Sequence, residues 1–205
     1  MTPALAPTGL IAILRGVEPA EAEAIAFVVI EAGFGAIEVP LNSPDPLASI
    51  AKIAARWEDR TLVGAGTVLS VAEVTAVAAA GAGLVVAPNA DPAVIAEAAK
   101  LELAVLPGVA TMTEAYEALR AGASGLKLFP AEAMAPEFVK AWRAVLPKDV
   151  QLYPVGGVTP ERIAPYRRAG ANGFGIGSAL YKPGGKARDV ERAARAFVNA
   201  WNESG

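Results

Sequence analysis

Lys127 is the residue whose surroundings point most directly to chemistry. It lies in the middle of the short apolar segment 124–130, and such a segment is typical of a buried strand in a parallel sheet. Strand alternation places Leu126 and Leu128 on one face and Lys127 on the other. Burial favours the neutral amine, the form that attacks carbonyl carbons to give Schiff bases. The alternative is a lysine whose ammonium group reaches solvent from a strand end.

Glu38 and Arg15 occupy comparable places in two earlier apolar segments. Glu38 is flanked by Ile37 and Val39, so alternation turns its carboxylate away from the helices. A buried carboxylate there can move protons for a reaction, or it can form a structural ion pair with Lys127. Arg15 ends the first apolar segment, and its guanidinium fork suits the carboxylate of an anionic substrate.

Two glycine-containing pairs follow the last two predicted strands. Gly156-Gly157 comes after the segment 150–155, and Gly177-Ser178 ends the segment 173–177. Glycine lets backbone N–H groups approach a phosphate closely. In (β/α)₈ barrels, phosphate commonly binds in the loops after the seventh and eighth strands, and the two segments above are the seventh and eighth strands predicted for this chain. Glycines after strands are also common as plain turns, so the evidence for a phosphate site is the presence of both pairs.

One pattern repeats along the chain: an apolar strand, a turn, a helix and an Ala-Gly stop. Strands are predicted at 10–15, 36–41, 61–65, 84–87, 103–106, 124–130, 150–155 and 173–177. Helix starts are predicted at Ser43-Pro44, at the capping box that begins with Ser70, at Asp91-Pro92 and at Thr159-Pro160. About eight units of roughly 25 residues predict a (β/α)₈ TIM barrel, a single domain spanning 1–205. An open doubly wound sheet is the alternative, although no G-x-G-x-x-G opens an early helix.

Composition excludes several kinds of chemistry. The chain of 205 residues has no histidine and no cysteine, which rules out Ser-His-Asp and Cys-His catalysis and zinc sites built on imidazole. We therefore expect no metal. Schiff-base chemistry at Lys127 would need no organic cofactor either, so none is expected. A net charge of −3 gives no electrostatic case for nucleic acid or a membrane surface as a partner. The absence of cysteine, of a secretory signal at 1–9 and of a long apolar segment favours a cytoplasmic protein.

Five motifs together resemble the KDPG/KHG aldolase family, and the resemblance runs in order from about residue 10 to 182. The motifs are Ile11-Ala12-Ile13-Leu14-Arg15-Gly16, Glu38-Val39-Pro40-Leu41-Asn42-Ser43, Gly64-Ala65-Gly66-Thr67, Leu126-Lys127-Leu128-Phe129-Pro130 and Gly156-Gly157-Val158. The resemblance implies a class I pyruvate aldolase on a (β/α)₈ barrel, assembled as a homotrimer. It also implies a phosphorylated keto acid as substrate, with pyruvate and glyceraldehyde 3-phosphate as products.

The same resemblance implies roles for individual residues. Lys127 matches the Schiff-base lysine and Glu38 the general acid and base. Arg15 and Thr67 match contacts to the pyruvate carboxylate. The residues that match the phosphate end are Gly156, Gly157, Gly177 and Ser178.

The substrate branch is indicated by two departures within these motifs. The gluconate-cleaving branch typically reads Glu-Ile-Thr after strand two and Pro-Thr-Gly-Gly after strand seven, whereas this chain has Glu38-Val39-Pro40 and Pro154-Val155-Gly156-Gly157. These departures resemble the galactonate branch, whose substrate differs in configuration at C4. Val155 lacks the hydroxyl of threonine, which changes what this position can bond. The favoured substrate is therefore 2-dehydro-3-deoxy-6-phosphogalactonate, with the gluconate isomer as the alternative.

Two functions from other classes remain open on the sequence. A sugar-phosphate isomerase or epimerase on the same barrel would use Glu38 as base and Lys127 as an electrostatic partner, without covalent attack. A non-catalytic barrel that binds a phosphorylated ligand is the other alternative. Burial of both ionisable groups argues against it, because that burial is unfavourable without a purpose.

Overall fold

The computed structural model describes residues 9–205. Residues 1–8 lie outside this range. They make up most of the segment 1–9, in which the sequence predicts no secretory signal. The strands are β1 (Leu10–Ile13), β2 (Ala36–Pro40), β3 (Leu62–Gly66), β4 (Leu84–Val86), β5 (Ala104–Leu106), β6 (Gly108–Val109), β7 (Leu126–Leu128), β8 (Leu152–Pro154) and β9 (Phe174–Ile176). The helices are α1 (Ala22–Ala32), α2 (Pro46–Trp57), α3 (Val71–Ala79), α4 (Pro92–Lys100), α5 (Met112–Arg120), α6 (Pro136–Arg143), α7 (Pro160–Ala169) and α8 (Ala187–Glu203), with a 3₁₀ turn at Ala131–Ala133. No helix within 9–205 is long and apolar enough to cross a membrane.

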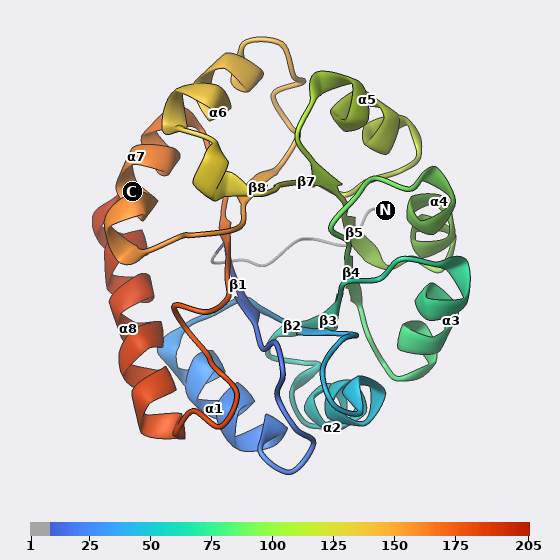
Figure 1. Cartoon of the computed structure of the whole chain (residues 1–205), viewed down its shortest axis with the longest axis vertical. Helices are drawn as coiled ribbons and strands as arrows, with labels where there is room; N and C mark the ends of the chain where they lie inside the picture. The colour runs from blue at the N-terminus through green and yellow to red at the C-terminus, as the bar shows by residue number, and fades with distance from the viewer. Residues whose placement is uncertain (1–8) are drawn as a thin grey trace.

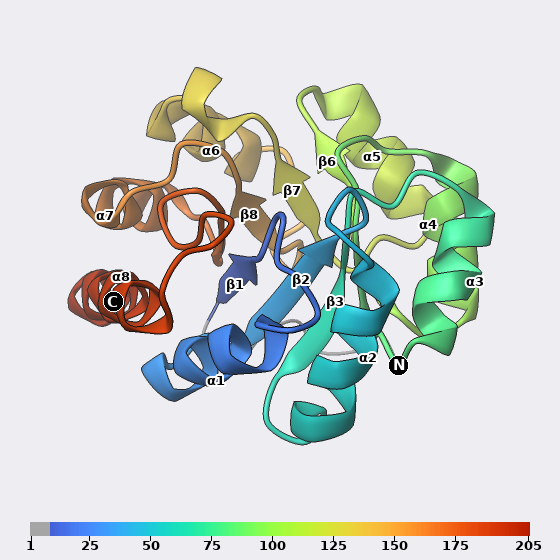
Figure 2. The ribbon, with the colours of Figure 1, turned by 60° about the horizontal axis from the view of Figure 1, so that its bottom comes forward.

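All the strand pairs are parallel, and the helices surround the strands as an outer ring (Figure 1). Helix α8 lies between α7 and α1, and β1 and β2 run side by side (Figures 1 and 2). The ladders form a six-stranded sheet in the order β5-β4-β3-β2-β1-β9 and a three-stranded sheet in the order β6-β7-β8. The predicted α/β class with parallel strands is confirmed.

The fifth predicted strand, 103–106, is observed as β5. The sequence did not predict the short strand β6, which follows Pro107 and pairs in the other sheet. Proline has no N–H to give to a ladder, so a strand that reaches it must bend or change partner. The described residues therefore form two ladders where the sequence predicted one continuous barrel sheet.

Two apolar clusters occupy the two faces of the strands. The larger cluster lies between strands and helices and includes Ile37, Val39, Leu126 and Leu128. The smaller cluster lies on the inner face and consists of Ile11, Ala36, Leu84, Val86, Ala104, Leu106 and Tyr153. Because successive side chains alternate in a strand, Glu38 and Lys127 belong to the inner face, as the sequence predicted.

Helix ends follow the predicted signals more closely than helix starts. Gly33 and Gly170 end α1 and α7 with φ values of 113° and 108°, which glycine adopts without a Cβ penalty. The predicted start of α2 at Ser43-Pro44 is wrong: the helix begins at Pro46. Ser43 is bonded elsewhere, because its Oγ accepts the Gly16 N–H at 2.9 Å. The loop after β2 therefore ties itself to the end of β1 before the helix begins.

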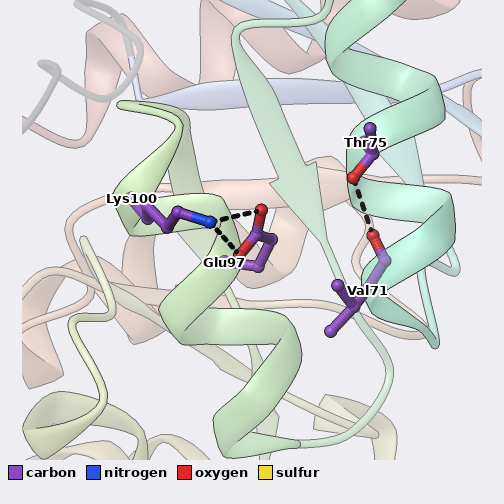
Figure 3. Close-up of polar contacts among 4 residues, drawn as sticks. All are labelled: Val71, Thr75, Glu97 and Lys100. Atoms are coloured by element: carbon purple, nitrogen blue, oxygen red, sulfur yellow. Dashed lines mark hydrogen bonds and ion pairs between the residues drawn. The ribbon is translucent and has the colours of Figure 1, made fainter.

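Polar contacts on α3 and α4 are local and exposed (Figure 3). Thr75 Oγ1 donates to the Val71 carbonyl at 3.2 Å, within one helical turn. Lys100 Nζ lies 3.1 Å from Glu97 Oε2, three residues apart on α4. Exposed pairs of this kind contribute about 0.2–1 kcal/mol each, so packing rather than surface charge stabilises these helices.

We predict that Asp91→Ala lowers the free energy of unfolding by about 1 kcal/mol. Asp91 Oδ1 accepts the N–H groups of Ala93 at 2.8 Å and Val94 at 3.4 Å, which lack partners at a helix start. Urea unfolding followed by circular dichroism measures the change. Asp59→Ala is the matched control, because no hydrogen bond of the Asp59 side chain occurs within 9–205, and an equal loss in both variants would contradict the capping role.

Candidate active site

The two ionisable side chains of the inner face lie in different strands and are both buried. Lys127 in β7 is 6% exposed, and Glu38 in β2 is 2% exposed. The ion pairs found within 9–205 at 4.0 Å or less join other residues and include neither side chain. Glu38 Oε2 is also without a hydrogen-bond partner among the described residues. The alternative of a direct structural ion pair is therefore not supported.

Burial shifts both groups toward their neutral forms. It raises the pKa of Glu38 from 4.5 to about 7, against the opposing charges of Lys127 and Arg15. It lowers the pKa of Lys127; Glu38 opposes this shift and the positive charge of Arg15 adds to it. A lowered pKa favours the neutral amine, the form that acts as a nucleophile, and a carboxyl with a pKa of about 7 can accept and release a proton near neutral pH.

Phe129 is a site residue that the sequence reasoning missed. The Lys127 Nζ atom lies 4.7 Å from the centroid of the Phe129 ring, so the amine meets an aromatic face instead of solvent. The alternative of a lysine that reaches solvent is therefore not supported. Alternation in the sequence already predicts Phe129 on the same face as Lys127, but it assigned Phe129 no role; in the structure Phe129 follows directly after β7.

Gly66 is a second missed residue, and it sets the place of the Glu38 carboxylate. A Cβ atom built on Gly66 would lie 1.8 Å from Glu38 Oε2, so the carboxylate lies where a side chain would be. Thr67 follows directly, with a left-handed φ of 58° that is uncommon for a residue with a branched side chain. The end of β3 therefore combines a missing side chain with an unusual backbone conformation beside the buried carboxylate.

The predicted substrate-binding residues line a cavity of about 650 Å³. Those that the structure brings together there are Arg15, Val155, Gly156, Gly157, Gly177 and Ser178. Its lining, as found within 9–205, does not include Lys127, Glu38 or Thr67, and Phe129 is the residue that both contacts Lys127 and lines the cavity. Glu132 and Lys182 are charged lining residues that the sequence reasoning missed.

The loop that contains Gly156 and Gly157 is held by Arg162. Arg162 donates from Nη1 to the Gly157 carbonyl at 2.7 Å and from Nη2 to the Ala131 carbonyl at 3.2 Å. Gly156 and Gly157 have φ values of 109° and 60°, in the left-handed region that glycine adopts without a Cβ penalty. Arg162 could not be identified from sequence, because its partners are carbonyl groups brought together by the fold.

A parallel α/β fold with a buried lysine amine on its inner face fits an enzyme that uses a lysine as nucleophile. Comparison with known proteins identifies the family. A family model described as KDPG and KHG aldolase matches residues 3–195, and the chain belongs to this family. The family and the enzyme class predicted from the sequence are thus confirmed.

Individual relatives carry the name of one branch. The chain is 48% identical to 2-dehydro-3-deoxy-6-phosphogalactonate aldolase of Escherichia coli (strain K12), over 95% of both chains. It is 50% identical to a probable 2-dehydro-3-deoxy-6-phosphogalactonate aldolase of Rhizobium meliloti (strain 1021), over 94% of this chain and 91% of the relative. A solved structure described as "Native KDPGal structure" matches with a TM-score of 0.94 and 48% identity, over 95% of both chains. The branch indicated by Val155 agrees with these names.

We predict that Glu38→Gln stabilises the fold at pH 8 while it reduces kcat by about 10². The folded-state pKa of Glu38 is raised, so the burial penalty is absent below the unfolded pKa of 4.5 and complete above about 7. A pKa shift of this size corresponds to a loss of about 3 kcal/mol in the free energy of unfolding once the carboxyl is ionised. Glutamine does not cause this loss, because it stays neutral.

Thermal unfolding at pH 4 and pH 8 tests this. The variant should unfold at the same temperature as the wild type at pH 4 and at a higher temperature at pH 8. Glu58→Gln, an exposed change on the C-terminal side of α2, is the control. Equal stability of Glu38→Gln and the wild type at both pH values would show that the carboxyl carries no such penalty.

Proposed function

We propose that this chain is a class I aldolase that cleaves 2-dehydro-3-deoxy-6-phosphogalactonate to pyruvate and D-glyceraldehyde 3-phosphate. The observation that carries the proposal is the buried Lys127 amine, which has a lowered pKa and no ion pair among the described residues. A neutral amine in such a place is what imine formation requires. The names of the relatives supply the choice of substrate.

The proposed reaction begins at the C2 ketone of the substrate. The Lys127 amine adds to C2, and loss of water gives an iminium ion. Glu38, as carboxylate, takes the proton of the C4 hydroxyl, and the C3–C4 bond breaks as the aldehyde forms. The electron pair of that bond moves into the iminium to give an enamine. Protonation at C3 and hydrolysis then release pyruvate and restore the amine.

The other predicted residues divide between the two ends of the substrate. Arg15 and Thr67 would bind the carboxylate next to C2, since a guanidinium group and a hydroxyl suit its oxygens. The N–H groups of Gly156, Gly157 and Gly177, with the Ser178 hydroxyl, would bind the phosphate. The cavity that Arg15 shares with these residues supports one binding site with two anionic ends.

We also infer that the two sheets act as one eight-stranded barrel, with β5 and β6 counted as a single strand bent at Pro107. An isolated parallel bridge between Val155 and Gly175 supports this on one side. On the other side, the Ser124 N–H donates to the Val105 carbonyl and the Lys127 N–H to the Pro107 carbonyl. The homotrimer stays a prediction from the family resemblance.

Reductive trapping is the experiment that tests the mechanism. Pyruvate with borohydride should inactivate the enzyme and add one pyruvate-derived mass to the Lys127 peptide, because the reduced imine is a stable secondary amine. Lys127→Arg should abolish labelling and turnover, because a guanidinium group stays protonated. Lys140→Arg, an exposed change on α6, should retain both. Turnover without trapping would favour the isomerase or epimerase alternative, which needs no covalent lysine.

Substrate choice is tested at Val155, which is buried, lines the cavity and forms the bridge to Gly175. The wild type should cleave the galactonate isomer faster than the gluconate isomer. Val155→Thr should shift the ratio of kcat/KM toward gluconate by about three- to tenfold, the effect of one hydrogen bond in the transition state. Val145→Thr, 58% exposed, is the control. A ratio that does not move would exclude Val155 as the selecting residue.

A further inference from the structure

We propose that Asn42 is the positioning residue that presents Arg15 to the carboxylate of the keto acid. This inference rests on the proposed function, and it assigns a role to the loop after β2 that the chemistry of Lys127 and Glu38 does not need. The role is to hold a guanidinium group in place while leaving its charge available.

Two adjacent residues of the loop after β2 hold two adjacent residues at the end of β1. Asn42 Oδ1 accepts a hydrogen bond from Arg15 Nη1 at 2.6 Å, and Ser43 Oγ accepts one from the Gly16 N–H at 2.9 Å. Ser43 is 8% exposed, so the second bond is shielded from water. One loop thus bonds both the backbone of this segment and the end of the arginine side chain, the Arg15–Asn42 bond being the exposed one of the two.

A second loop limits the same segment from the other side. Gly16 has a φ of 81°, and a Cβ atom built on it would lie 2.6 Å from Pro183 Cγ. Pro183 belongs to the loop after β9, which also lines the cavity through Ser178 and Lys182. Arg15 is therefore presented from a segment that lies between the loop after β2 and the loop after β9.

The Asn42 side chain, which accepts the hydrogen bond from Arg15, is neutral, so it does not compensate the positive charge that Arg15 would offer to a carboxylate. The ion pairs found within 9–205 do not include Arg15, and its charge influences the pKa of both Glu38 and Lys127. A guanidinium group has five N–H donors, so a single bond to Asn42 leaves a pair of donors for a carboxylate. An aspartate at position 42 would instead form an ion pair and compete with the substrate.

The experiment measures how much ketone is needed to trap Lys127 with borohydride at half-maximal extent. The probes are pyruvate, which has a carboxylate, and pyruvamide, which has the same ketone but a neutral amide. Asn42→Ala should raise the half-saturating pyruvate concentration by about three- to tenfold, the effect of one hydrogen bond. It should leave the pyruvamide value unchanged. Asn42→Asp should raise the pyruvate value further than Asn42→Ala does.

Asn89→Ala is the matched control, because Asn89 is an exposed asparagine in the loop after β4 and is not part of the cavity lining found within 9–205. An unchanged pyruvate value in Asn42→Ala would overturn the inference while the proposed function stands. So would an equal change for both probes, since that is the result of a merely structural role. An Asn42→Asp value at or below that of the wild type would overturn the argument from the neutral acceptor. Absence of trapping in the wild type would overturn the proposed function and this inference with it.

Discussion

The chemistry proposed for this fold depends on the burial of two ionisable side chains that do not neutralise each other by direct contact. Lys127 and Glu38 lie on the inner face of the strands, and both are displaced toward their neutral forms by loss of hydration. A direct ion pair would stabilise both charges and would hold the amine protonated. Because no direct ion pair joins the two groups within 9–205, burial is the largest influence on the pKa of each.

The surrounding fold compensates for this unfavourable burial with apolar packing. The large cluster between strands and helices contains branched side chains such as Ile37 and Leu128, next in sequence to Glu38 and Lys127. Each ionisable residue is thus held by neighbours that point the opposite way into a fully apolar layer. Small residues such as Gly66 leave room on the inner face for the long polar side chains.

Sequence reasoning reached the features that follow from periodicity and local chemistry. Alternation identified the inner faces of Glu38 and Lys127, and the Ala-Gly stops identified helix ends such as Gly33. It missed Gly66 and Phe129, because their roles arise from contacts with other side chains. It placed the start of α2 at Ser43, a good capping residue, because the competing bond to Gly16 joins positions 27 residues apart. It ended the fifth strand at 106, as observed for β5, but it did not predict β6, because the pairing of β6 depends on how the neighbouring strands meet.

The change of sheet at Pro107, between β5 and β6, has a mechanical consequence. Glu38 belongs to the six-stranded ladder and Lys127 to the three-stranded ladder, so no continuous series of paired strands joins them. Within a ladder, spacing is fixed by hydrogen bonds at every second residue, and it can change only if those bonds break. Between the two ladders, the backbone contacts are the bridge between Val155 and Gly175 and single hydrogen bonds, such as those from the Ser124 N–H to the Val105 carbonyl and from the Asn172 N–H to the Leu152 carbonyl. The position of Lys127 relative to Glu38 therefore rests on side-chain packing and on a few single backbone bonds, not on one uninterrupted ladder.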